Sequence, residues 1–334
     1  MRVLIVSVPP KAPLVRQIES LHSLGVDVDV MEVTGIPKFK YLQCLPHFVK
    51  LADYADLIHA HYGYCGWLGL SQLHKPLVVS FMGSDLLGTP NDHGNVTYGS
   101  RVVVHCNRWL AGKVNAVIVK SAEMAHIIAP IKSHIIPNGV DMESFCPIER
   151  SEARMSLGLS IKKRYILFPA RPELPTKGFP LFQAVVARAS QCIPDALEPI
   201  LLSGVPADKV PIYMNACDVM LLTSWWEGSP NVVKEAMACN VPVVSVPVGD
   251  VPELLNGVDE SEVCPRNAEI LAHAVWRRLH GSGRSNGRDA LRRKGLDLKT
   301  VARKIVRVYE EVLQTTATFI RVKDSISISA SLRS

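Results

Sequence analysis

Two glutamates, Glu227 and Glu235, lie in the part of the sequence that is best suited to chemistry. Between them, Ser229 and Pro230 are typical of a helix start, with Ser229 as the N-cap and Pro230 as the first helical residue. The backbone N–H groups of a first helical turn have no partners within the helix, so they can bind an anion with help from the helix dipole. The segment therefore predicts a diphosphate site at this helix start.

The two carboxylates are suited to bind a sugar nucleotide whose diphosphate occupies that site. Glu235 lies about a turn and a half into the predicted helix, and helical side chains tilt toward the N-terminus, so its carboxylate can reach a vicinal diol such as a ribose. Glu227 precedes the helix, nearer to where a sugar would extend from the phosphates. The alternative is that Glu227 is a surface loop residue and Glu235 a solvated helix residue. The spacing and the cap residues favour ligand binding.

Short apolar runs, separated by helical patterns, must position this segment. Runs of this length are typical of parallel strands that are covered on both faces, and the helices between them predict βαβ units. The chain is therefore expected to be α/β, with two Rossmann-like β/α/β domains facing across a cleft and ligands bound beyond the C-terminal strand ends. The runs are residues 3–8, 26–30, 57–60, 77–81, 116–119 and 134–136, then 165–168, 200–203, 219–223, 241–246 and 262–264.

With these motifs in place, the sequence resembles family 4 of the retaining glycosyltransferases (glycosyl transferases group 1), which have the GT-B fold. The resemblance covers nearly the whole chain to about residue 313. It is carried by the Glu-x7-Glu pair Glu227/Glu235, by residues 236–239 and 241–244, and by Val248-Gly249-Asp250-Val251-Pro252-Glu253. Further upstream it rests on Pro137-Asn138-Gly139-Val140-Asp141, Ala170-Arg171, Lys177-Gly178, Asp56-Leu57-Ile58-His59-Ala60-His61 and Phe81-Met82-Gly83-Ser84-Asp85.

The resemblance implies transfer of a hexosyl-type sugar from a nucleotide-diphosphate-sugar to an acceptor hydroxyl, with retention at the anomeric carbon. Arg171 and Lys177 would hold the donor diphosphate, because charge develops on the leaving group and cations must stabilise it where no metal does. Glu235 would bind the ribose and Glu227 a sugar hydroxyl, and Val205 lies where the family places the nucleobase. The implied donor site comprises Arg171, Lys177, Val205, Glu227, Gly228, Ser229, Pro230, Asn231, Val232 and Glu235, with Glu227, Arg171 and Lys177 as the catalytic set.

The acceptor side departs from the family pattern. Many relatives have a glycine-rich loop after the first strand, whereas residues 7–13 contain three prolines and no glycine. Many relatives also place a histidine where Met82 stands here. Arg16 could supply charge or be a plain surface residue, and Asp85 could contact the acceptor or cap a helix. The acceptor-side candidates are Arg16, His61, Gly83, Asp85 and His105; a lone histidine is more often structural.

The domain organisation follows from these segments. Residues 1–142 are predicted to form the acceptor-side domain, and residues 143–300 the nucleotide-sugar-binding domain. Apolar residues recur along one stripe of the last helical pattern, so residues 301–314 are expected to form a helix that packs back toward the N-terminal domain. The Ser/Thr-rich stretch 315–334 is predicted to be disordered.

Composition excludes several other classes. No metal is expected, because Asp27 and Asp29 lie inside an alternating strand and the eight cysteines show no zinc spacing. No cofactor is expected beyond the nucleotide-sugar co-substrate, since the one glycine-rich stretch, 281–287, does not follow a strand. Nucleic acid is not expected, because a net charge of +6 comes without long basic runs.

The N-terminal segment and two basic segments bear on where the protein acts. The N-terminus has no signal-peptide core, so a cytoplasmic protein active in polysaccharide or glycolipid biosynthesis is expected. The basic and apolar segments 38–50 and 101–113 could lie on the inner face of a membrane and select a lipid-linked acceptor, or could be ordinary solvated helices. Two other functions stay open, a nucleotide-sugar epimerase of the same fold and a non-catalytic GT-B binding or assembly module.

Overall fold

The structure is a computed structural model that describes residues 1–9, 12–37, 39–72, 74–89, 96–192, 197–281 and 283–331, with side chains to residue 318 except that of residue 192. The chain divides into two compact units, which are described separately. The first comprises Met1–Leu86, Val102–Ile136 and Val301–Ser334, and the second comprises Leu87–Arg101 and Pro137–Thr300. The division after Ile136 falls six residues before the predicted end of the first domain at residue 142.

The first unit is built on a six-stranded parallel sheet in the order β2-β1-β3-β4-β5-β6. Its strands are β1 (Arg2–Ser7), β2 (Asp27–Glu32), β3 (Leu57–His61), β4 (Leu77–Ser80), β5 (Ala116–Val119) and β6 (His134–Ile135). The helices that connect them are α1 (Ala12–Ser23), α2 (Lys40–Ala52), α3 (Gly63–Leu70), α4 (Ser84–Leu87), α5 (Tyr98–Ala111) and α6 (Ala122–Ile128).

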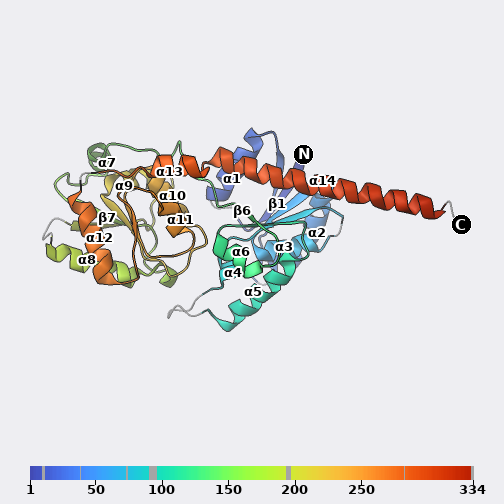
Figure 1. Cartoon of the computed structure of the whole chain (residues 1–334), viewed down its shortest axis with the longest axis horizontal. Coiled ribbons are helices and arrows are strands. Elements are labelled where there is room, and N and C mark those ends of the chain that lie inside the picture. Colours follow the sequence, from blue (N-terminus) through green and yellow to red (C-terminus); the bar gives the residue numbers. More distant parts are fainter. Residues whose placement is uncertain are drawn as a thin grey trace. The chain divides into compact units, whose positions relative to one another are not determined.

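The C-terminal helix α14 (Leu298–Ser331) completes the core of the first unit. Its stripe of Val301, Ile305, Val308 and Val312 packs with strand residues such as Val3 in one buried cluster. The helix, red in Figure 1, continues to Ser331, which differs from the disordered tail predicted for residues 315–334. No glycine or proline follows residue 298, and each added residue of a growing helix gains a hydrogen bond, so nothing local ends it.

The second unit has a five-stranded parallel sheet in the order β11-β10-β9-β7-β8. Its strands are β7 (Arg164–Phe168), β8 (Leu197–Leu201), β9 (Val219–Leu222), β10 (Val243–Ser245) and β11 (Glu262–Val263). Its helices are α7 (Arg150–Ser156), the 3-10 turn η1 (Pro175–Lys177), α8 (Phe179–Cys192), α9 (Val210–Ala216), α10 (Asn231–Ala238), α11 (Val251–Leu255), α12 (Ala268–His280) and α13 (Gly287–Lys294).

All eleven apolar runs predicted as strands form strands, and the central ones are buried along their whole length. Burial on both faces explains why these segments are continuously apolar rather than alternating. Strand order reverses between β1 and β3 in the first sheet and between β7 and β9 in the second. Ligands of open parallel sheets bind beyond the carboxyl ends of the strands at such a reversal, so these two places position any site. Across the described ranges, no helix has both the length and the hydropathy of a bilayer-spanning segment.

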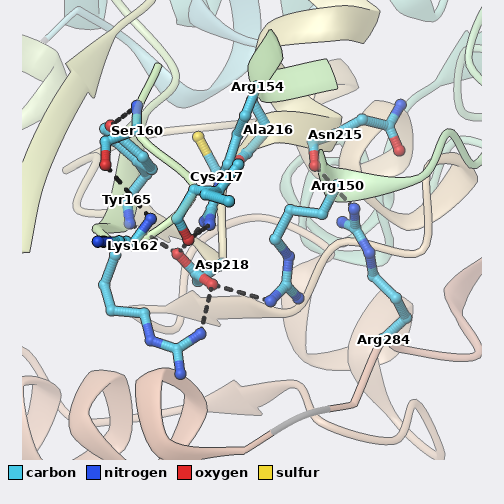
Figure 2. Close-up of polar contacts among 12 residues, drawn as sticks. Arg150, Arg154, Ser160, Lys162, Tyr165, Asn215, Ala216, Cys217, Asp218 and Arg284 are labelled. Carbon is cyan, nitrogen blue, oxygen red and sulfur yellow. Dashed lines mark hydrogen bonds and ion pairs between the residues drawn. The ribbon is translucent and has the colours of Figure 1, made fainter. Parts of the chain in front are cut away.

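A network of charges holds the opposite, amino-terminal edge of the second sheet. Asp218 precedes β9 and is only 2% exposed. Its carboxylate accepts hydrogen bonds from Arg150 at 2.9 Å and Arg154 at 2.7 Å, and from the Tyr165 backbone N–H at 2.7 Å. Arg164, the first residue of β7, adds a contact at 3.3 Å. Figure 2 shows Arg150 and Arg154 reaching Asp218 from α7. One carboxylate therefore joins α7 to the starts of β7 and β9.

Substitution Asp218→Asn should lower the free energy of unfolding by about 3–5 kcal/mol, because it leaves the buried guanidinium of Arg154 and its two less buried neighbours without their counter-charge. Urea denaturation at pH 7 measures this. The matched control is Asp289→Asn, since the pair of Asp289 and Arg292 on α13 is exposed and should change stability by less than about 1 kcal/mol. Equal losses in the two variants would contradict the role given to the buried network.

Candidate functional site

The loops that follow β7 and β9 meet at the strand reversal of the second sheet. Lys177 ends η1, after β7, and Glu227 lies in the loop after β9. The Lys177 Nζ atom is 2.5 Å from Glu227 Oε1, and the two side chains are 28% and 15% exposed. Two residues that were predicted to bind the donor thus form an ion pair that solvent still reaches.

Backbone contacts lock these two loops together. The Trp225 N–H donates to the Thr176 carbonyl at 2.8 Å, and the Thr223 hydroxyl donates to the Lys177 carbonyl at 3.1 Å. Gly178 has φ of +67°, and a Cβ atom there would lie 2.1 Å from the Thr223 carbonyl oxygen. Only glycine permits this approach, which explains the Lys177-Gly178 motif in physical terms.

Arg266, which no sequence motif marks, also holds the loop that follows β9. Its guanidinium donates to the carbonyls of Ser224 at 3.0 Å and Thr223 at 2.9 Å, and lies 3.5 Å from the Trp225 ring centroid. Burial lowers the pKa of Arg266 to about 10, so the group stays charged at pH 7. The only signal in the sequence was its position just after a strand, β11, in a loop without a motif.

The start of α10 differs from the prediction in its cap. Pro230, not Ser229, is the N-cap, and no side chain caps the helix. The Ser229 hydroxyl instead donates to Asp250 Oδ2 at 2.6 Å and accepts from Lys234 Nζ at 3.1 Å. The Val233 N–H bonds back to the Pro230 carbonyl at 3.2 Å. Ser229 therefore holds the loop instead of capping the helix, because its hydroxyl donates to a buried carboxylate and accepts from a buried ammonium.

Lys234 and Asp250 hold the loop between β9 and α10 through their contacts with Ser229. Lys234 is 1% exposed and donates to the Asn138 carbonyl at 2.8 Å, which ties α10 to the Pro137–Asp141 turn. Burial lowers the pKa of Lys234 to about 8 and raises that of Asp250 to about 6. Next to Asp250, Gly249 has φ of +54°, and a Cβ there would lie 2.6 Å from the carbonyl oxygens of Glu227 and Gly228. The loop carrying Glu227 is thus enclosed on several sides.

The other predicted donor residues lie along the same edge. Arg171 follows β7 and is exposed, and within the described part of the chain its guanidinium has no hydrogen-bond partner. Glu235 and Val232 are half-buried on the first turns of α10, and Asn231 Oδ1 accepts from Asn138 Nδ2 at 3.4 Å. Val205 is half-buried after β8, beside Gly204, which has φ of +71°. The nucleobase role of Val205 stays a prediction.

In the first unit, His61 ends β3 at the strand reversal. It is 5% exposed, and burial lowers its pKa to about 3, so the ring is neutral at pH 7. Its Nε2 lies 3.4 Å from Gln17 Nε2, and its Nδ1 has no partner among the described residues. Both ring nitrogens of the neighbouring His59 make hydrogen bonds inside the core. Nδ1 lies 2.6 Å from the Tyr309 hydroxyl of α14, and Nε2 lies 2.8 Å from the Ser80 hydroxyl.

Asp85 resolves one of the alternatives left open by the sequence. It is 2% exposed, and its carboxylate accepts from the backbone N–H groups of Met82, Gly83 and Gly63. Burial raises its pKa, and these hydrogen bonds act in the opposite direction. Asp85 therefore holds the loop around Gly83, whose φ is +144°, rather than facing a ligand. Acceptor contact by Asp85 is the interpretation that the geometry disfavours.

The remaining acceptor-side candidates are dispersed. Arg16 is half-buried on α1, and His105 is exposed on α5. Two residues of the proline-rich loop, Pro10 and Lys11, lie outside the described residues. The D-x-D sequence in β2 has a structural partner, since Arg2 Nε donates to Asp29 Oδ2 at 2.7 Å and lies 3.9 Å from Asp27 Oδ2.

Both units resemble known domains. Residues 168–280 match the model of the glycosyl transferases group 1, and residues 36–144 match that of glycosyltransferase family 4. The fold matches a sucrose-phosphate synthase from Thermosynechococcus elongatus with a TM-score of 0.76 at 19% identity, over 94% of this chain and 100% of that one. Anabaena HepE in complex with UDP-glucose matches with a TM-score of 0.71 at 20% identity, over 93% and 100%. The architecture is therefore that of the GT-B glycosyltransferases.

Matches to both domain models show that the chain belongs to the family 4, group 1 glycosyltransferases. It is 29% identical over 247 residues to a Bacillus subtilis protein named for teichuronic acid biosynthesis, over 68% of this chain and 62% of that protein. It is 25% identical over 267 residues to a D-inositol 3-phosphate glycosyltransferase of Mycobacterium sp. strain KMS, over 66% and 58%. The matched region thus spans about three fifths of the length of these relatives.

Substitution Arg266→Ala should weaken nucleoside-diphosphate binding about tenfold and destabilise the second unit by about 2–4 kcal/mol, because two carbonyls lose a charged donor. Calorimetric titration with UDP, GDP and ADP measures the first effect, and urea denaturation measures the second. Arg266→Lys, which keeps the charge but loses the fork, should fall between. Arg293→Ala, on the exposed face of α13, is the matched control. Nucleotide affinity equal to that of the control would contradict the positioning role.

Proposed function

We propose that this chain transfers a hexosyl group from a nucleotide-diphosphate-sugar to an acceptor hydroxyl, with retention of anomeric configuration and without a metal ion. The observation that carries the proposal is the Lys177–Glu227 pair at the β7/β9 strand reversal, beside the start of α10. Family membership supports the same reaction class. The two HepE structures named as complexes with UDP and with UDP-glucose, which share the fold, are consistent with a nucleotide-sugar donor.

The donor diphosphate would bind between the first turn of α10 and the cations of the β7 loop. Lys177 supplies a point charge, and the exposed Arg171 can offer a bidentate fork to phosphate oxygens. Negative charge grows on the diphosphate as the glycosidic bond breaks, so these cations stabilise the transition state more than the ground state. Glu235 would hold the ribose diol. The phosphates would take over the charge of Lys177, and the freed Glu227 carboxylate would accept a hydrogen bond from a sugar hydroxyl.

The acceptor oxygen would attack on the face from which the diphosphate departs. One bond forms between the acceptor oxygen and the anomeric carbon, and the bond from that carbon to the phosphate oxygen breaks. The acceptor proton passes to an oxygen of the leaving diphosphate. Asp85 is engaged with backbone N–H groups and Met82 stands at the family's histidine position, so neither side chain would take that proton.

The acceptor is proposed to be a polysaccharide or a lipid-linked sugar. The relative named for teichuronic acid biosynthesis is consistent with a polysaccharide. Thermal shift with UDP-, GDP- and ADP-sugars identifies the donor first, because a ligand that binds only the folded state raises the melting temperature.

With that donor, Lys177→Ala and Arg171→Ala should lower kcat for transfer by about 100-fold to 1,000-fold, since each removes charge stabilisation of the leaving group. Glu227→Gln should also lower kcat, and Glu235→Gln should mainly raise the donor KM by about tenfold, because one ribose hydrogen-bond partner loses its charge. Product formation and nucleotide release are measured together.

The control is Glu173→Gln, an exposed carboxylate in the same loop as Lys177, which should leave both parameters unchanged. Turnover equal to the control in all four variants would overturn the assignment. Nucleotide release that needs no sugar acceptor would indicate an epimerase instead, and binding without turnover against any acceptor would indicate a non-catalytic module.

A further inference from the structure

Three helices of the first unit share an outward surface of aromatic and basic side chains. Tyr41 of α2 lies 5.7 Å from Tyr64 of α3 between ring centroids. One turn further along α3, Trp67 stacks on Trp109 of α5 at 5.4 Å with an interplanar angle of 2°. The Tyr41–Tyr64 pair thus joins α2 to α3, and the Trp67–Trp109 pair joins α3 to α5. We call Lys40, Tyr41, Tyr64, Trp67, Trp109 and Lys113 the aromatic–basic face.

Three of these four rings are exposed rather than packed into the core, and the fourth, Tyr41, is half-buried. Trp109 is 53% exposed, Tyr64 46% and Trp67 37%. Phe39 and Leu42, which flank Lys40 and Tyr41 in the sequence, are 58% and 69% exposed. The core of the same helices is filled by other residues, such as Cys65 of α3 and Leu110 of α5. A single exposed apolar residue needs no explanation, but two pairs of rings in contact, with further exposed apolar side chains on α2, mark a surface that meets a partner.

The charge on this surface has one sign. None of α2, α3 and α5 contains an aspartate or a glutamate. Lys40 Nζ lies 5.3 Å from the Tyr41 ring centroid, and Lys113 Nζ lies 5.2 Å from that of Trp109. Lys50 and Arg108 add two exposed cations on α2 and α5. The face is therefore complementary to a partner that is anionic at its surface and apolar beneath.

We propose that the aromatic–basic face docks this protein on an anionic lipid bilayer. Tryptophan and tyrosine favour the depth of the lipid headgroups, where a ring is apolar on one side and wet on the other. Lysine stems lie along apolar surface while their ammonium groups reach the phosphates. A soluble polyanion would satisfy the cations but would leave Phe39 and Leu42 in water, so the apolar neighbours favour the bilayer.

The face is also joined to the loop that holds Gly83. The Trp67 indole N–H donates to Asn107 Oδ1 at 3.2 Å, and Asn107 Nδ2 donates to the Asp85 carbonyl at 2.9 Å. Asn107 is 1% exposed, and a Cβ on Gly63 would lie 2.5 Å from its side chain, so the connection is closely packed. Docking would therefore place the predicted acceptor loop close to the lipid, as a lipid-linked acceptor requires.

Flotation of the full chain with vesicles tests this proposal. Vesicles of phosphatidylcholine mixed with phosphatidylglycerol should recover the protein at low salt, and vesicles of phosphatidylcholine alone should recover much less. The double variant Lys40→Gln/Lys113→Gln should lower the partition coefficient by about tenfold or more, because each cation near an anionic surface favours binding about fivefold. Trp109→Ala should lower it by a similar factor without changing the salt dependence.

Matched controls lie in the second unit. Trp276→Ala removes a tryptophan that is 38% exposed on α12, and Lys162→Gln removes an exposed lysine, and both should bind vesicles as the unaltered chain does. Donor binding should be the same in all variants, so failure of this proposal is distinguishable from failure of the proposed function. Circular dichroism melting confirms that each variant is folded.

Two results would overturn the proposal. One is equal recovery of the unaltered chain and the two face variants on anionic vesicles. The other is absence of vesicle binding together with salt-sensitive binding to a soluble anionic polysaccharide, which would assign the face to a polyanion.

Discussion

The predicted donor side depends on one close approach, between the turn that ends at Gly178 and the carbonyl end of β9. The parallel pairing of β7 and β9 brings together segments that are fifty residues apart, but pairing alone does not align their loops. Alignment comes from the missing side chain of Gly178, which lets the Thr223 carbonyl come within 2.1 Å of where a Cβ would stand. Lys177 reaches Glu227 because the backbone on both sides of Lys177, at Thr176 and at Gly178, is held against the loop after β9.

Much of this arrangement was predictable, because it follows from local patterns. The mainly apolar runs predicted the strands, since a strand buried on both faces carries few polar residues and must pair those it has, as His59 does. The pairing of Lys177 with Glu227 agrees with roles inferred from motifs on two separate loops. Motifs predict which residues touch a ligand, and strand ends predict where loops meet, so together they predicted that Lys177 and Glu227 lie close to each other.

The features that the sequence did not reveal depend on contacts between distant residues. Ser229 has the right type and place for an N-cap, yet its hydroxyl is taken by Asp250 and Lys234, which reach it only in the folded chain. Arg266 has no motif, because its partners are backbone carbonyls and any loop sequence provides those. Composition likewise predicted a disordered end for the chain, whereas the helix begun in the core continues.

The predicted acceptor side has a different physical character, because several polar residues of its strands and loops are used to build the protein. Asp85 holds three backbone N–H groups, and His59 is shared between Ser80 and Tyr309. A loop fixed in this way has little capacity to adapt to a soluble acceptor. It would bind an acceptor better if that acceptor always arrived in one orientation. A bilayer presents a lipid-linked sugar in that way, and it confines enzyme and acceptor to one surface, which raises their effective concentration. Rigid support from Asn107 between the aromatic–basic face and the Asp85 loop would then convert binding at the lipid into correct placement of the acceptor.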